Sequence, residues 1–172
     1  YWLTNTLSEY KTASLSGLKV SKKLLKHHKH TPAQKIANSA ITLVQDKHNL
    51  IPVKDVKPKS IAIVNIGGNG AEFEEYCHKY ADVDIYNTAY HTKALKKYDT
   101  VIAAVYKSNQ SASHQLSTLK KLPNVIEVFF VNPYKISPMK GSISGGAAVI
   151  FAYDDTENLQ SAAAQAIFGG IE

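Results

Sequence analysis

The residues of this chain that could do chemistry gather where short apolar runs give way to polar turns. One run, 60–66, contains Asn65 and stops at a glycine-rich turn, and later runs stop at Asn132–Pro133–Tyr134 and at Tyr153–Asp154. The carboxyl ends of parallel strands meet at one edge of a sheet, where ligands dock. The candidate binding residues at this edge are Asn65, Asn132, Tyr134 and Asp154.

The glycine-rich turn, Gly67–Gly70, has part of a nucleotide-binding pattern. It follows an apolar run and precedes a helical pattern, as a dinucleotide fingerprint should. With Gly68 and Gly70 as the first two glycines, however, the third position is Phe73, which would block close helix–strand packing. No phosphate-loop lysine–serine pair follows the turn. A free-standing flavodoxin-like domain that binds a nucleotide or another small molecule is therefore the alternative interpretation, and no cofactor is expected.

The acidic residues do not form a catalytic pair. Glycoside hydrolysis needs two carboxylates across a cleft, whereas Asp154 and Asp155 are neighbours, and we expect them and Thr156 to cap the next helix. Glu127 lies within an apolar run and is expected to point at solvent or at a partner domain. Cys77 lies on the apolar stripe of a helix, as a core residue would. The His-rich tract 22–30 has no cysteine or acid, which favours a solvated helix end over a metal site.

Alternating apolar runs and amphipathic stretches predict an α/β fold. The expected strands are 60–66, 83–86, 101–106, 124–131 and 147–152. Such a chain forms a three-layer αβα sandwich with a mainly parallel sheet of about five strands, of flavodoxin-like type. A helix is expected from Thr31 to about Asn49, and a second helix is expected to start at a capping pair, Asn69 and Glu72. The expected division is a segment of linker helices over 1–55 and the sandwich domain over 56–172.

Composition narrows the classes of function. The 172 residues carry a formal net charge of +6, and all 20 basic residues are lysines. Arginine is the residue that reads bases and clamps phosphates bidentately, so specific nucleic-acid recognition is disfavoured. No apolar run is long enough to span a bilayer, and one cysteine excludes an internal disulfide. The chain starts at Tyr1–Trp2 and ends just past a helix, which we interpret as the ends of a piece cut from a longer protein.

Several stretches together resemble the C-terminal α/β domain of glycoside hydrolase family 3. The family has a helix and linker of the type "TL(L/V)-x-(N/D)" followed by "N-L-(L/I)-P", then a first strand, an "NPY" after a later strand, a "VI-x-AY-(D/E)" strand end and an "AAAQAIFGG" helix. The matching stretches are 37–53, 60–67, 132–134, 149–154 and 162–170. The resemblance covers about residues 36 to 170, and residues 1–3 look like the tail of a linker from a preceding barrel.

The resemblance implies a parent enzyme that cleaves β-N-acetylglucosaminides or β-glucosides with retention. In the family the nucleophilic aspartate belongs to an N-terminal (β/α)₈ barrel, and so does the acid/base of the β-N-acetylglucosaminidase branch. The glutamate that serves the β-glucosidase branch has no counterpart here, because 106–109 and 132–134 contain none. The implied role is a non-catalytic domain that supports the barrel and lines its cleft with the candidate residues. The resemblance also implies a bacterial periplasmic or secreted parent.

Overall fold

The computed structural model describes residues 32–54, 56–143 and 146–170. Residues 32–172 form one compact unit. The linker helices expected before residue 32, the His-rich tract and Tyr1–Trp2–Leu3 all lie outside the described residues. The elements are α3 (Pro32–Ala40), β1 (Thr42–Asp46), β2 (Ile61–Ile66), α4 (Ala71–His78), β3 (Val83–Tyr86), α5 (Thr92–Leu95), β4 (Thr100–Val105), α6 (Gln110–Leu119), β5 (Val125–Phe129), the 3₁₀ turns η1 (Pro133–Lys135) and η2 (Ser137–Met139), β6 (Ala148–Phe151) and α7 (Glu157–Phe168).

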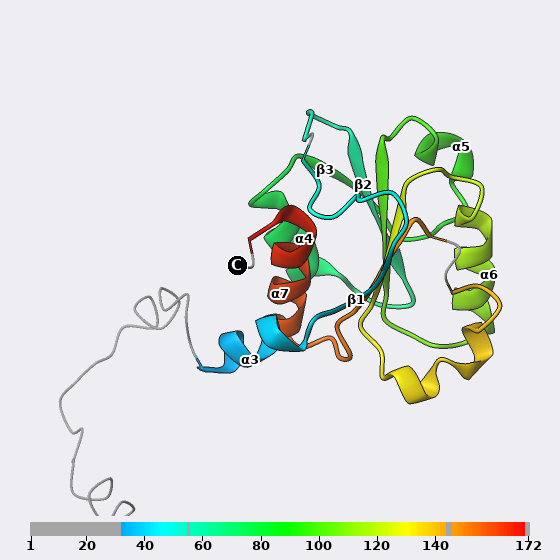
Figure 1. Ribbon diagram of the computed structural model, residues 1–172. Helices are drawn as coiled ribbons and strands as arrows, with labels where there is room; N and C mark the ends of the chain where they lie inside the picture. The colour runs from blue at the N-terminus through cyan, green and yellow to red at the C-terminus, as the bar shows by residue number, and fades with distance from the viewer. Residues whose placement is uncertain (1–31, 55, 144–145, 171–172) are drawn as a thin grey trace, which may run out of the picture. The chain divides into compact units, whose positions relative to one another are not determined.

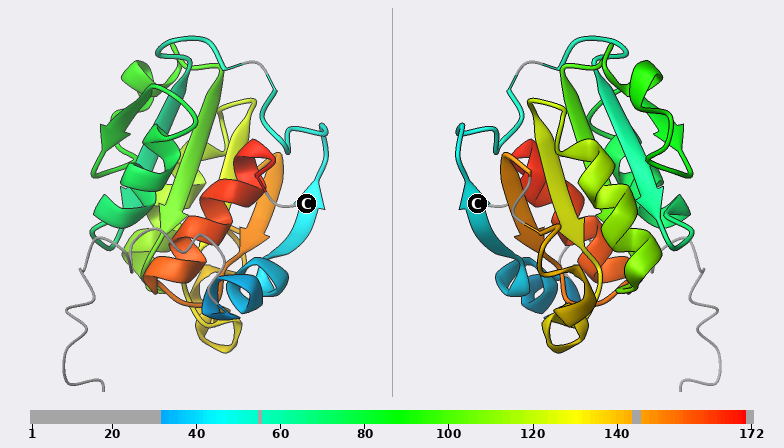
Figure 2. Two further views of the ribbon diagram at one scale, coloured as in Figure 1. Left: turned by 90° about the vertical axis from the view of Figure 1, so that its left-hand side faces the viewer. Right: turned by 90° about the vertical axis from the view of Figure 1, so that its right-hand side faces the viewer.

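Within the described residues the strands form one six-stranded sheet in the order β1-β6-β5-β4-β2-β3. All neighbouring strands are parallel except β1, which runs antiparallel to β6. Helices α4 and α7 cover one face, and α5 and α6 cover the other (Figures 1 and 2). The predicted three-layer αβα sandwich with a mainly parallel sheet is therefore confirmed.

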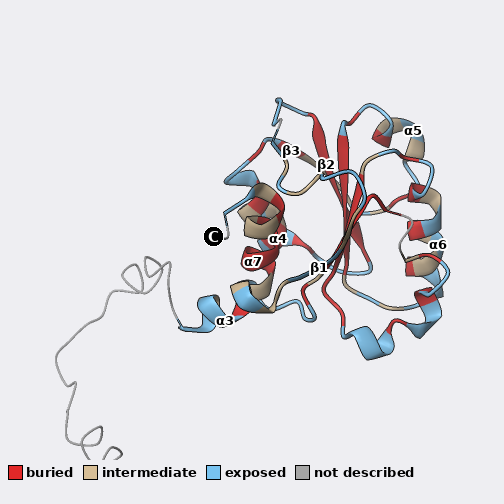
Figure 3. Ribbon diagram, viewed as in Figure 1, coloured by how far each residue is buried: buried red, intermediate tan, exposed pale blue. Residues whose placement is uncertain are grey.

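The central strands are apolar along their whole length because both faces of the sheet are covered. Every residue of β2, β4 and β5 is buried, and these strands form the red centre of Figure 3. Continuous apolar runs of this kind, rather than alternating ones, are typical of buried parallel strands. Each run ends in a turn at the same edge of the sheet, and the candidate residues lie in these turns, except Asn65, which lies near the end of β2.

Strand β1 replaces the second half of an expected helix. The prediction of a helix to about Asn49 is wrong, because the helix ends at Ala40 and residues 42–46 pair with β6. Ile41 and Val44 have helical spacing, yet Val44 is 60% exposed and the ladder bulges between Leu43 and Gln45. Tertiary pairing with β6 thus overrides the local pattern. Whether residues 1–55 link the sandwich to a barrel stays a prediction.

Candidate functional site

Two of the predicted residues, Asn132 and Tyr134, lie together at the carboxyl edge of the sheet. They line an open hollow of about 490 Å³ with Pro133 and Tyr153. We call the hollow bounded by these four residues the tyrosine hollow. It lies beyond the ends of β5 and β6, since η1 follows β5 and Tyr153 follows β6. Its volume falls in the range of roughly 300–1,000 Å³ that small-molecule sites occupy.

The short turn η1 holds Tyr134 in place. The backbone N–H of Tyr134 donates to Asn132 Oδ1 at 2.9 Å, and Pro133 occupies the first position of the turn. Proline fixes its own φ and suits this position. The backbone is therefore held while the Tyr134 side chain stays in solvent, with 95% of the residue exposed.

Tyr153 forms the opposite part of the hollow. Its hydroxyl lies 2.8 Å from Thr42 Oγ1 on the edge strand β1, and its ring lies 6.2 Å from the ring of Phe151. Its backbone has a positive φ of 68°. A non-glycine residue in this region stores about 1–3 kcal/mol of strain. Two tyrosines thus face the same hollow from turns that are fixed independently.

Asp154, the third predicted residue, lines an adjoining hollow of about 470 Å³ that shares Asn132 and Tyr153 with the first. We call this second space the charged hollow. Lys107 and Lys135 also line it, as does Asp155. Asp154 Oδ1 accepts a hydrogen bond from the Asp155 backbone N–H at 2.8 Å. Of the predicted capping residues 154–156, Thr156 is the N-cap residue of α7, although its side chain makes no capping hydrogen bond. The expected capping by the two aspartates is wrong.

Asn65, the fourth predicted residue, lies apart from both hollows. It is only 2% exposed, and its Nδ2 donates to Glu74 Oε1 on α4. It sits where the loops after β2 and β4 diverge, because α4 covers one face of the sheet and α6 the other. Sheets of this type bind ligands at such a switch point. We call the position between Asn65, Gly68 and Gly70 the switch-point crevice.

The Tyr106 side chain fills the switch-point crevice. A Cβ on Gly68 would overlap its ring, and a Cβ on Gly70 would come within 2.8 Å of its hydroxyl. The ring stacks on Phe130 with the two centroids 5.0 Å apart. Gly68 is therefore required by the close approach of Tyr106, and Gly70 by the close approach of both Asn65 and Tyr106. Sequence reasoning missed this residue, although an aromatic side chain directly after β4 was the available signal.

Two polar atoms in the crevice have no hydrogen-bond partner among the described residues. They are Asn65 Oδ1 and Tyr106 Oη, and both are shielded from solvent. Burial raises the pKa of the Tyr106 phenol well above its ordinary value, and Cys77 and Glu74 raise it further. Tyr106 is thus held neutral, which suits a packing role and not proton transfer near pH 7.

The start of α4 is fixed by α7 and not by the predicted capping pair. Gly70 is the N-cap residue, and Asn69 Oδ1 accepts from the Ala71 N–H at 3.2 Å. Glu72 Oε2 instead accepts from Gln160 Nε2 of α7 at 3.1 Å. The buried Gln160 also accepts the Phe73 N–H through Oε1 at 3.1 Å. The two helices that flank the crevice are therefore tied together at their N-terminal ends.

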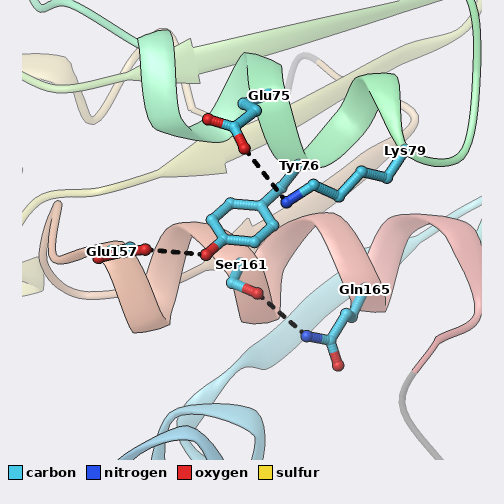
Figure 4. A network of polar contacts seen from close by, with 6 residues as sticks. All are labelled: Glu75, Tyr76, Lys79, Glu157, Ser161 and Gln165. Atoms are coloured by element: carbon cyan, nitrogen blue, oxygen red, sulfur yellow. Dashed lines mark hydrogen bonds and ion pairs between the residues drawn. The ribbon is translucent and has the colours of Figure 1, made fainter. Parts of the chain in front are cut away.

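A second set of contacts joins α4 to α7 nearer the surface (Figure 4). Tyr76 donates its hydroxyl proton to Glu157 Oε1 at 3.0 Å, and Lys79 Nζ lies 4.0 Å from the centre of the Tyr76 ring. Lys79 also pairs with Glu75 at 3.4 Å. Desolvation by burial and the Glu157 hydrogen bond raise the pKa of Tyr76 to about 12.

Glu127 does not point at solvent or at a partner domain, so that expectation is wrong. It is 1% exposed on β5, and its Oε1 accepts the Gly146 backbone N–H at 3.0 Å. The carboxylate thus holds the loop that precedes β6. Cys77 is buried as predicted. In the described part of the chain, no three His, Cys, Asp or Glu side chains are grouped to hold a metal ion, and no helix has the length and hydropathy of a membrane span.

Comparisons with known proteins identify the fold. No family model matches the chain, and no curated protein matches it either. Among solved structures, a Listeria innocua β-glucosidase in complex with isofagomine matches with a TM-score of 0.72 and 14% identity over 98% of this chain and 29% of that one. A fungal multi-domain GH3 β-N-acetylglucosaminidase matches with a TM-score of 0.70 and 16% identity over 81% of this chain and 17% of that one.

A glycoside hydrolase family 3 β-N-acetylglucosaminidase from Paenibacillus sp. also matches, with a TM-score of 0.62 and 14% identity over 81% of this chain and 30% of that one. At these identities the likeness shows the fold alone. The chain spans less than a third of the length of each of these proteins. The fold expected from the sequence resemblance is therefore confirmed as one that occurs within larger family 3 enzymes.

Proposed function

We propose that this chain is the non-catalytic C-terminal α/β domain of a family 3 β-glycosidase, in which a (β/α)₈ barrel of the same polypeptide cleaves the glycosidic bond. One observation carries the proposal. The chain is matched over 81% to 98% of its length by glycosidases of which it spans only 17% to 30%. The sequence motifs in 37–53, 132–134 and 162–170 support the same family independently of the fold.

The positions of the acidic side chains support a non-catalytic role. Two catalytic carboxyl groups must lie about 5–9.5 Å apart across an open cleft. In the described part of the chain, the acids that line the hollows at the carboxyl edge are Asp154 and Asp155, which are adjacent on one turn. Glu127 is buried against Gly146 and cannot reach a sugar. Bond cleavage therefore requires groups from another domain.

The carboxyl edge is the surface through which the domain would line the barrel's cleft. Asn132 and Tyr134 line the tyrosine hollow, and Asp154 lines the charged hollow beside it. Asn65 would act indirectly, because it is buried and holds the loop before α4 through Glu74. The substrates of the parent enzyme would be β-N-acetylglucosaminides or β-glucosides, and the partner of the domain would be the barrel.

Two measurements test this proposal. The purified chain should not hydrolyse 4-nitrophenyl β-glucoside or 4-nitrophenyl N-acetyl-β-glucosaminide, because the acids that line the hollows among the described residues are adjacent on one turn and do not form a pair across a cleft. The genomic sequence upstream should encode a (β/α)₈ barrel in the same reading frame. Turnover that persists through repurification and is abolished by substituting a residue of this chain would contradict the proposal, and so would an upstream frame without a barrel.

A further inference from the structure

We propose that the amino edge of the sheet is a docking surface for an anionic lipid bilayer. The surface, which we call the lysine edge, consists of segments 54–60, 96–99 and 120–124, which precede β2, β4 and β5. It is at the top of Figures 1 and 2, at the end of the sheet opposite the two hollows. Binding there would need no second domain, so it is independent of the proposed function.

Positive charge is concentrated at this end of the sheet. The three segments hold seven lysines and two aspartates, a net charge of +5. The turns of the carboxyl edge hold two lysines and four acids, a net charge of −2; these turns are 67–72, 106–109, 130–135 and 152–157. An anionic surface would therefore orient the domain with the lysine edge toward it and the two hollows away from it.

Backbone and side-chain contacts make the three segments one continuous surface. Strands β5, β4 and β2 are neighbours in the sheet, and neighbouring strands lie about 4.8 Å apart. The Asp99 N–H donates to Ser60 O at 2.9 Å, and Asn124 Nδ2 donates to Asp99 O at 3.0 Å. Each segment is thus hydrogen-bonded to the next one along the edge.

The turn before β2 holds two of the lysines in fixed positions. Both the N–H and the hydroxyl of Ser60 donate to Lys57 O, at 3.2 and 2.7 Å. Lys59 has a positive φ of 56°, a conformation that non-glycine residues keep only where the surrounding structure enforces it. Lys57 and Lys59 are both exposed, so a rigid turn presents two ammonium groups to solvent.

Helix dipoles account for some of the lysines but not for these. Lys96 and Lys120 are the C-cap residues of α5 and α6, where positive charge is stabilised by the helix dipole. Lys54, Lys57 and Lys59 instead precede a strand. Among the described residues, the side chains of these three lysines make no ion pair or hydrogen bond. Their charge is therefore available to a partner.

The composition of the lysine edge favours a bilayer over a nucleic acid. Lysine is a hydrated point charge that needs no geometric match, as in the attraction of basic segments to anionic headgroups. Single-stranded nucleic acids are bound with stacking on aromatic rings, but Tyr98, the one aromatic residue of the three segments, is only 6% exposed. Val56 is 38% exposed between Lys54 and Lys57, and apolar side chains among lysines are typical of interfacial binding.

Co-sedimentation of the full chain with vesicles tests the proposal. The chain should bind phosphatidylcholine vesicles that contain about 30% phosphatidylglycerol, not pure phosphatidylcholine, and about 1 M NaCl should release it. The variant with Lys57→Gln, Lys59→Gln and Lys121→Gln should bind at least about tenfold more weakly. The matched control removes the same charge elsewhere, with Lys35→Gln, Lys93→Gln and Lys135→Gln, and should bind like the original chain.

A fluorescent label tests the orientation. Cys77 is buried, so an environment-sensitive dye can be attached selectively to Val56→Cys or to Tyr134→Cys at the opposite edge. The dye at position 56 should shift to the blue when the anionic vesicles are added, because it enters the headgroup region. The dye at position 134 should not shift.

Three outcomes would overturn the proposal. One is that the lysine-edge variant binds the vesicles as well as the control variant, which would assign binding to residues 1–31, where the sequence has six further lysines. Another is that only the dye at position 134 shifts. The third is that a DNA duplex of about 20 base pairs binds more tightly than the vesicles at equal salt and the lysine-edge variant loses it, which would make the edge a nucleic-acid surface.

Discussion

The carboxyl edge of the sheet has two halves that differ in one respect: the chain's own side chains fill one of them. At the switch-point crevice, Tyr106 lies under Gly68 and Gly70 and stacks on Phe130. At the tyrosine hollow, Tyr134 is fixed by its backbone while its ring stays in solvent. A tyrosine after a strand is thus a packing element in one half and a free surface in the other.

The two halves of the carboxyl edge differ in whether a ligand would find open space there. The crevice is the position where open parallel sheets bind nucleotides, but here it is occupied and two of its polar atoms lack partners among the described residues. The neighbouring hollow, displaced toward β5 and β6, is the half that can receive a ligand.

Truncating each of the two tyrosines to alanine should show the difference between the two halves most clearly, as unequal losses of stability. Tyr106→Ala should lower the free energy of unfolding by roughly 3 kcal/mol, because it leaves a cavity against Phe130 and Gly68. Tyr134→Ala should change it by less than about 0.5 kcal/mol, since the side chain packs on little. Urea denaturation of the three proteins measures both values. Equal losses for the two variants would contradict the division into a filled half and an open half.

Adding one methyl group should separate the crevice from an exposed turn. Gly68→Ala should cost about 1–3 kcal/mol, because the new Cβ would overlap the Tyr106 ring. Gly141→Ala is the control, since its Cβ would meet nothing within 4 Å. In a double-mutant cycle, Tyr106→Gly should recover much of the Gly68→Ala loss, because it removes the Tyr106 ring and also the Tyr106 Cβ, which would lie nearest to the new methyl group. Independent, additive losses would show that Tyr106 does not occupy the crevice.

Removal of the Tyr106 hydroxyl tests the unpartnered atom. A buried hydroxyl without a partner costs free energy, so Tyr106→Phe should leave stability unchanged or raise it by up to about 1 kcal/mol. Tyr98→Phe is the contrasting variant, because Tyr98 donates to Asp84 and lies 3.0 Å from the Tyr86 hydroxyl. That variant should be destabilised. A clear loss for Tyr106→Phe would mean that its hydroxyl has a partner.

The smallest effect should come from Tyr76, which joins α4 to α7 behind the crevice. Its pKa is raised to about 12 in the folded chain, chiefly by burial and then by Glu157, from an ordinary value of 10.0. A raised folded pKa stabilises the fold below pH 10, and this contribution is lost as the pH rises toward 12. Melting temperatures between pH 9 and 12 should therefore fall less steeply for Tyr76→Phe than for the original chain. Parallel curves would refute the role of this phenol.

The central strands could be predicted from the sequence because each buried strand is a continuous apolar run. Runs such as 101–106 admit few other structures once polar turns flank them. The sequence did not predict β1, because residues 42–46 form a strand by pairing with β6, which lies far away in the chain. Pairing partners at a sheet edge leave little trace in a short segment.

The candidate residues were predicted in the same uneven way. Their position at strand ends was enough to predict that Asn132, Tyr134 and Asp154 lie close together, and they line two adjoining hollows. It was not enough for Asn65, whose burial depends on how Tyr106 from another strand end packs. Glu127 was misplaced because its carboxylate accepts the N–H of Gly146, a residue far away in the chain. That these residues line a substrate cleft stays a prediction.

A crystal of the chain soaked in cellobiose or N,N′-diacetylchitobiose tests the non-catalytic role most directly. Its structure would show both halves of the carboxyl edge and whether the sugar is cleaved. We expect any bound disaccharide to stay intact and Tyr106 to remain in the switch-point crevice. A sugar bound in that crevice with Tyr106 displaced, or a disaccharide cleaved at a site built from these residues alone, would contradict this expectation.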